Sequence, residues 1–156
     1  MPSLWALGAF IAICGAVLLA GGAITAPAIP VWYAGLVKPS FNPPPWTFSI
    51  VWPILFLAMA IAGWLAWRSA GGFAAPRSVF MLFAIQLALN LLWSALFFGL
   101  KSPLAALVEI AFLWLAIAAT LVAFWRIDWL AGLLFVPYLA WVSFAAILNA
   151  AIWRLN

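Results

Sequence analysis

The charged residues of this chain are few, and nearly all of them lie at the ends of long uncharged runs. Only 5% of the 156 residues are charged, whereas about a quarter are charged in an ordinary soluble domain. They are Lys38, Arg68, Arg77, Lys101, Glu109, Arg126, Asp128 and Arg154. Only Glu109 falls inside a run. Because a charge at the centre of a bilayer costs at least about 2.5 kcal/mol, this pattern indicates a chain whose solvent is lipid.

The uncharged runs cover residues 4–24, 46–67, 78–100, 102–125 and 129–153. Each is long enough to cross roughly 30 Å of hydrocarbon as a helix, and none alternates as a barrel strand does. The sequence therefore predicts an all-α integral membrane protein, a five-transmembrane-helix bundle in one domain over residues 1–156. The expected helices are about 4–24, 46–67, 78–99, 103–125 and 129–153.

The one long connection, residues 25–45, is rich in proline. It contains Pro27, Pro30, Pro39, Pro43, Pro44 and Pro45. Because proline lacks a backbone donor and breaks helices, we expect an extended, stiffened loop. The loop also carries Trp32, Tyr33 and Phe41, whereas a floppy linker is polar and rich in Gly and Ser. The sequence predicts a lid that folds over one end of the bundle.

The residue inventory excludes most conventional chemistry. The chain has no His, a single cysteine (Cys14) and two acids, too few for a Ser-His-Asp triad, a zinc site or a catalytic carboxylate pair. The six basic residues are scattered at helix ends and form no cluster, so nucleic-acid binding is not expected. Because His is absent and Cys14 is the only cysteine, no metal site is expected either. The basic residues divide equally between the two ends of the bundle, which favours neither orientation in the membrane. We therefore expect neither ATP-driven pumping nor conventional hydrolysis, and no required cofactor.

A few polar side chains lie within the spans. Gln86 and Asn90 are four residues apart and share a helix face with Trp93 nearby, and Asn149 lies late in the last span. Such amides either join neighbouring helices by hydrogen bonds or contact a ligand, and both interpretations stay open. Glu109 is interpreted as an acid paired with Lys101 or water, or alternatively as a proton relay in a proton-coupled exporter.

Four tryptophans lie too deep in the spans for an interfacial belt: Trp52, Trp93, Trp114 and Trp141. Indole rings offer large flat faces for stacking, so a pocket that they line would suit a large, flat, apolar ligand. Ala145 follows Trp141 by one helical turn, which places a small residue beside a large ring. Ordinary core packing is the alternative for each of these tryptophans.

Several motifs, in this order along nearly the whole chain, resemble the translocator protein (TspO/MBR) family. Residues 32–44 begin Trp-Tyr-Ala-Gly and end Phe-Asn-Pro-Pro, like the first-loop signature of that family. The Trp52 region, the Gln86, Asn90 and Trp93 pattern, and Pro-Tyr-Leu-Ala-Trp at residues 137–141 also match. The family includes bacterial tryptophan-rich sensory proteins and the mitochondrial peripheral benzodiazepine receptor.

The resemblance implies a five-helix bundle, commonly a homodimer, with a pocket under the first loop. It implies binding of protoporphyrin IX, haem, sterols and benzodiazepine-type compounds, by a sensor, regulator or carrier. The expected ligand-binding residues are Tyr33, Pro43, Pro44, Trp52, Gln86, Asn90, Trp93, Trp141 and Ala145. Some bacterial members are described as promoting light-dependent porphyrin breakdown, which would make Trp52 and Trp141 the reactive residues here.

One segment departs from the family pattern. The sterol-recognition segment of animal members has a Tyr before its basic residue, and residues 148–154 here have Leu148 and Arg154 but no Tyr. Such motifs are weak even when they are complete. We therefore expect weak sterol binding and a multi-pass protein of a bacterial cell membrane.

Overall fold

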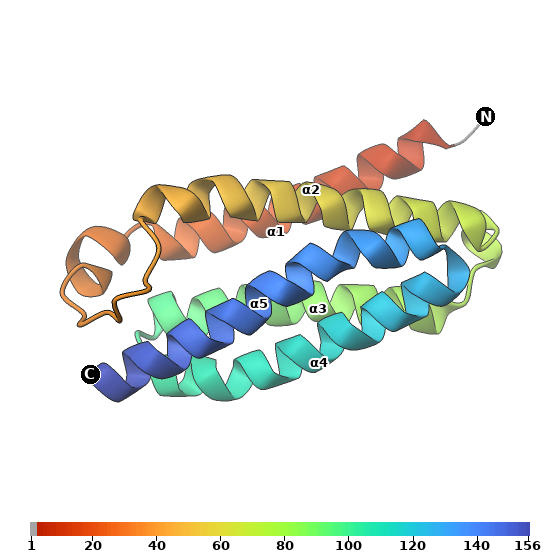
Figure 1. The fold of residues 1–156 in the computed structure, drawn as a ribbon. Helices are drawn as coiled ribbons and strands as arrows, with labels where there is room; N and C mark the ends of the chain where they lie inside the picture. Colours follow the sequence, from red (N-terminus) through yellow and green to blue (C-terminus); the bar gives the residue numbers. More distant parts are fainter. Residues whose placement is uncertain (1–2) are drawn as a thin grey trace.

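The computed structural model describes residues 3–156, which form five long helices (Figure 1). The helices are α1 (Leu4–Thr25), α2 (Pro45–Ser69), α3 (Arg77–Ser94), α4 (Pro103–Ile127) and α5 (Trp129–Leu155). A π-helical segment, η3 (Ala95–Gly99), continues α3, and a 3-10 turn, η2 (Gly72–Ala74), precedes it. All five long elements are apolar enough and long enough to cross a membrane. The predicted five-helix, multi-pass membrane bundle is confirmed.

The ends of the helices follow from local chemistry. Pro45 and Pro103 stand in the first turns of α2 and α4, where a missing N–H costs little. Ser102 caps α4 by accepting a hydrogen bond from the backbone N–H of Ala105, at 3.2 Å. Asp128 caps α5 through the N–H of Leu130, at 3.0 Å. Within the described residues, each span lies within two residues of its predicted bounds.

The five helices are arranged in a closed ring. α1 packs against α2 and α3, α4 packs against α3 and α5, and α5 returns to α2 (Figure 1). At the end away from the first loop, aromatic side chains fill the interior; Phe83 stacks on Phe124 at 5.8 Å between ring centroids. Gly63 lets α1 approach there, since a Cβ added to it would lie 2.7 Å from the Phe10 ring.

The first loop differs from prediction in its opening half. Instead of extended backbone, residues Ile29–Tyr33 form a π-helical turn, η1. The turn is closed by hydrogen bonds from Tyr33 N to Ala28 O, at 2.9 Å, and from Ala34 N to Ile29 O, at 3.0 Å. Pro30 is tolerated because it stands at the start of the turn, where its missing donor is not needed.

The loop, residues 26–44, covers one end of the bundle as predicted, and we call it the lid (Figure 1). The Tyr33 ring packs 5.7 Å from Phe98, and the Phe41 ring lies 6.3 Å from Phe144 on α5. The side chain of Asn156 accepts a hydrogen bond from Val37 N and donates one to Val37 O, at 3.0 and 2.9 Å. Aromatic packing and one amide therefore hold the lid to the bundle.

Candidate functional site

A cavity of about 550 Å³ lies beneath the lid, inside the ring of helices. Its walls come from α1, α2, α3 with η3, and α5, and the π-helical turn of the lid contributes Ile29 and Tyr33. Ligand pockets in proteins measure roughly 300–1,000 Å³ and are mostly apolar. The cavity thus has the size and the lining of a small-molecule site.

Six of the nine predicted ligand-binding residues line this cavity. They are Tyr33, Trp52, Asn90, Trp93, Trp141 and Ala145. Residues that are far apart in the sequence therefore meet at one cavity.

The other three predicted residues do not line it. Gln86 is fully buried one turn beyond Asn90, on the side away from the lid, and its Nε2 lies 3.7 Å from the sulfur of Met59 on α2. This contact agrees with the interhelical interpretation of Gln86. Pro43 and Pro44 stay in the lid outside the cavity, and Pro45 is the proline of that run that lines it.

Indole and phenyl rings form one wall. Trp52 on α2 and Trp141 on α5 meet edge to face, with ring centroids 6.4 Å apart and planes at 89°. Trp93 stacks on Phe97 at 5.0 Å and 19°. Trp114, which we had grouped with these rings, lies outside the cavity and donates its indole N–H to Ser143 at 2.8 Å. Three of the four deep tryptophans therefore belong to the site.

Two amides of the wall, Asn90 and Asn149, join helices by hydrogen bonds, whereas the buried indole N–H of Trp141 has no partner among the described residues. Asn90 donates to the hydroxyl of Tyr138, which is completely buried, at 2.7 Å. Trp93 donates its indole N–H to Asn149 Oδ1 at 3.0 Å, and Asn149 donates to the carbonyl of Pro103 at 2.8 Å. The amides join helices, as one interpretation held, and Asn90 and Asn149 also line the cavity.

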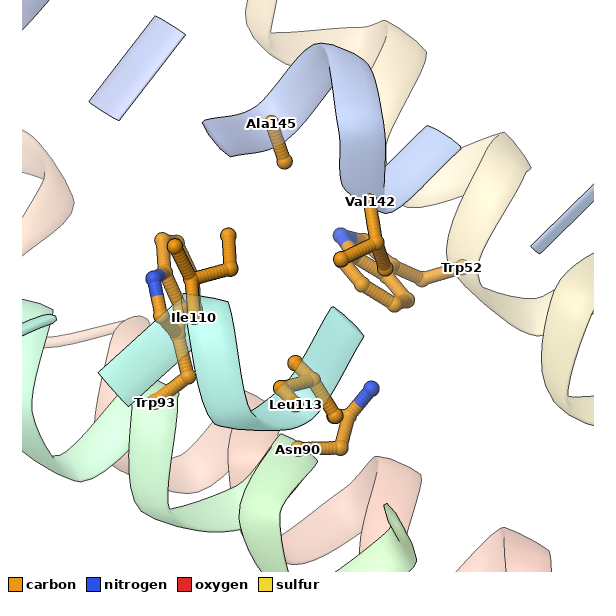
Figure 2. A pocket seen from close by; sticks show the side chains of 7 residues that line it. All are labelled: Trp52, Asn90, Trp93, Ile110, Leu113, Val142 and Ala145. Carbon is orange, nitrogen blue, oxygen red and sulfur yellow. The ribbon is translucent and has the colours of Figure 1, made fainter. Parts of the chain in front are cut away.

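A second, small pocket of about 10 Å³, which we call the extension, shares Trp52, Asn90, Trp93 and Ala145 with the cavity. Figure 2 shows it between Trp52 and Trp93, with Val142 and Ala145 of α5 facing α3 and α4. The volume is at the lower limit for one water molecule. Since Ala145 carries only a methyl group, this point is where a larger side chain would most directly reduce the space.

Glu109 stands apart from the cavity. It is buried in α4, with 6% of its surface exposed, and it does not line the cavity or its extension. Among the described residues neither carboxylate oxygen has a hydrogen-bond partner, so the expected pairing with Lys101 is wrong. Lys101 stands before α4 with a φ of 55°, in the turn that leads into this helix.

The lining residues carry no formal charge. The nearest cation by contact is Lys38 of the lid, whose Nζ lies 4.8 Å from the centre of the Tyr33 ring. Tyr33 donates its hydroxyl proton to Asn42 Oδ1 at 3.1 Å. Burial raises the pKa of the Tyr33 hydroxyl, and the hydrogen bond to Asn42 offsets part of that rise. At neutral pH Tyr33 is therefore a neutral donor.

The contribution of α1 was missed from the sequence. Leu18, Gly21 and Thr25 line the cavity, as do Ser49 on α2 and Ser94 on α3. A span that is apolar all around gives no periodic signal of which face turns inward. A possible signal was the run of small residues at 20–23, which leaves room between helices.

Comparisons with known proteins place these features in context. The sequence pattern of the TspO/MBR family matches residues 10–154. The chain is 48% identical over 153 residues to the Tryptophan-rich protein TspO of Chlorobaculum tepidum, covering 94% of this chain and 92% of that protein. It is 40% identical over 153 residues to the Tryptophan-rich sensory protein of Cereibacter sphaeroides, covering 97% and 92%. It is 44% identical over 126 residues to the human Translocator protein, covering 80% and 75%.

Proposed function

The chain belongs to the TspO/MBR family, and from that premise we propose that it binds tetrapyrroles such as protoporphyrin IX and haem within the membrane. It would act as a sensor or regulator, or as a carrier, in a bacterial cell membrane. The observation that carries the proposal is the uncharged cavity of about 550 Å³, walled by Trp52, Trp93 and Trp141.

Shape and chemistry both favour such a ligand. A flat macrocycle can stack on indole and phenyl faces at centroid distances of about 4.5–7 Å, the range in which the wall rings already contact one another. Fixed polar groups at Asn90 and Tyr33 can orient a ligand without adding charge to the wall. The name of the Cereibacter relative, a sensory protein, fits the sensing role.

The test replaces one wall indole at a time. Trp52→Phe and Trp141→Phe should each weaken protoporphyrin IX binding by roughly two- to tenfold, because an aromatic contact is worth about 0.5–1.5 kcal/mol. Binding is followed by the shift of the Soret absorption, which does not depend on tryptophan emission. Trp114→Phe is the matched control, since Trp114 lies outside the cavity.

Unchanged affinity in both wall variants, or an equal loss in the control, would remove the proposed site. Haem and cholesterol are titrated in parallel by thermal shift. Because residues 148–154 lack the Tyr of the sterol segment, we expect cholesterol to stabilise the protein less than protoporphyrin IX does.

A second candidate function is light- and oxygen-dependent breakdown of the bound porphyrin. It is favoured by the edge-to-face contact of Trp52 and Trp141 at the cavity wall. An excited porphyrin passes energy to O₂, and the oxygen species formed attack the ring or the adjacent indoles. Soret bleaching under light should be faster than with an unrelated membrane protein and should require O₂. Equal rates would eliminate this function.

A proton-coupled exporter that uses Glu109 is the third candidate. Its support is the burial of that carboxyl in a span with no hydrogen-bond partner among residues 3–156. Glu109→Gln should then flatten the dependence of porphyrin affinity on pH between about pH 5 and 8. An identical pH profile in the variant would dispose of the idea.

A further inference from the structure

The charge of the cavity wall limits what part of a ligand can enter. No lining residue is charged, in the part of the chain that the structure describes. An isolated carboxylate is costly to bury away from water and from any counter-charge. A ligand with acidic arms must therefore keep those arms outside the wall, at the mouth of the cavity.

The cavity opens along the gap between α1 and α2. The exposed lining residues within the two spans are Leu19, Gly22, Ala23 and Pro53, and those nearer the lid are Ala26, Ile29, Pro45 and Ser49. A charged arm that left between the spans would enter hydrocarbon, which is costly. An acidic arm therefore leaves at the lid end, where α1 ends and α2 begins, and we call that end of the opening the mouth.

Lys38 is the cation of the lid itself. Its half-buried side chain donates to the carbonyl of Leu36 at 3.1 Å and lies over the ring of Tyr33, which lines the cavity. The chain has only two acids. Asp128 accepts hydrogen bonds from Ser69 and Leu130 at the opposite end, and Glu109 is buried in α4. Neither side-chain carboxylate within residues 3–156 therefore pairs with Lys38.

We propose that Lys38 binds an acidic arm of the ligand at the cavity mouth. The preferred ligand is therefore a flat apolar body with carboxylate groups along one edge, its ring among the tryptophans and its acids at the lid. This inference rests on the proposed function and specifies which end of the ligand faces the membrane surface. The Lys38 ammonium has three N–H donors, and one bonds to the carbonyl of Leu36. The others can bind a carboxylate whose position varies.

The test compares protoporphyrin IX, a dicarboxylic acid, with its dimethyl ester in vesicles of zwitterionic lipid. Lys38→Met should weaken binding of the acid by roughly two- to fivefold and leave the ester unchanged, since a partly exposed ion pair is worth up to about 1 kcal/mol. Lys38→Arg keeps the charge and should retain the affinity. Added salt should weaken acid binding in the unaltered protein but not in Lys38→Met.

Lys101→Met is the matched control. It removes the same charge from the same end of the bundle, in the turn between η3 and α4, without touching the lid. An equal loss of acid binding in this control would assign the effect to general surface charge and overturn the proposal. Equal losses for acid and ester in Lys38→Met would overturn it as well. If the unaltered protein binds neither protoporphyrin IX nor its ester, the proposed function itself fails. If the unaltered protein binds both and Lys38→Met changes the affinity for neither, the role of Lys38 is refuted and the proposed function stands.

Discussion

Asn149 shows how one residue serves both the fold and the site. Its amide accepts from Trp93 of α3 and donates to the carbonyl of Pro103 at the start of α4. Asn149→Leu would leave the indole N–H of Trp93 without a partner in an apolar interior, at a cost of about 1–3 kcal/mol. We expect a lower unfolding temperature and weaker protoporphyrin IX binding, because Trp93 loses its fixed orientation.

The matched control for this residue is Ser143→Ala. It also removes the acceptor of an indole N–H, that of Trp114, but outside the cavity. It should lower the unfolding temperature less and leave porphyrin affinity unchanged. Equal binding losses in the two variants, measured by Soret titration in the same detergent, would show that Asn149 acts on stability alone.

The sequence predicted individual site residues unevenly. Trp52, Asn90 and Trp141, which line the cavity, were singled out by the family resemblance and because their type is unusual for their depth in a span. Gln86 is equally unusual, yet it faces Met59, because four residues along α3 move a side chain one turn past the cavity. Residue type thus indicates that a buried position is special, whereas only the packing decides what it contacts.

At the scale of elements, one side chain ties the lid to the end of α5. Among residues 3–156, the side-chain hydrogen bonds that join the lid to another part of the chain are the two between Val37 and Asn156, the residue that follows α5. Asn156→Ala should open the lid more often, because two hydrogen bonds worth roughly 0.5–1.5 kcal/mol each are lost. Stopped-flow measurements should give association and dissociation rates for protoporphyrin IX that both rise severalfold, with little change in Kd.

Leu155→Ala is the control for the lid, because Leu155 is exposed at the same helix end. Its exchange rates should match those of the unaltered protein. If Asn156→Ala exchanges ligand no faster than this control, then lid opening does not limit entry. A rise in dissociation alone would mean that Asn156 stabilises the bound state rather than the closed lid.

The membrane-spanning helices were more predictable from the sequence than the site residues were, for a physical reason. Hydrocarbon thickness fixes the length of a span and excludes charge from it, so the uncharged runs mark the helices directly. The lid was less predictable. Its prolines indicated extended backbone, but Pro30 stands where a turn needs no donor, and Ile29–Tyr33 became helical. Proline content excludes a long helix without excluding a single turn.

The order of the helices around the ring lay outside the reach of the sequence. Nothing in five apolar spans says that α5 returns to α2 or that α1 adds a wall to the cavity. α1 is also the least buried of the five spans. In its most apolar stretch 6% of the residues are buried, against 22–33% in the other four spans. Most of the surface of α1 therefore faces lipid or a partner.

At the scale of the whole molecule, we propose a homodimer through the outer faces of α1 and α3. A Cβ added to Gly8 or Gly15 would meet no atom within 4 Å, and Ala84 and Ala88 are exposed one turn apart. Small residues let helices approach closely in lipid, where packing contacts replace the hydrophobic effect. Ala84→Leu with Ala88→Leu should therefore shift the protein towards monomer. Cross-linking and light scattering in mild detergent measure the shift.

Ala111→Leu is the control for the dimer, because it enlarges an exposed small residue on α4, a helix that is not part of the proposed interface. It should leave the association state unchanged. Since the cavity is built within one chain, the monomeric double variant should still bind protoporphyrin IX with its original affinity. A monomer that has lost the ligand would instead mean that the partner shapes the cavity. An unaltered protein that is monomeric in the same detergent would refute the dimer.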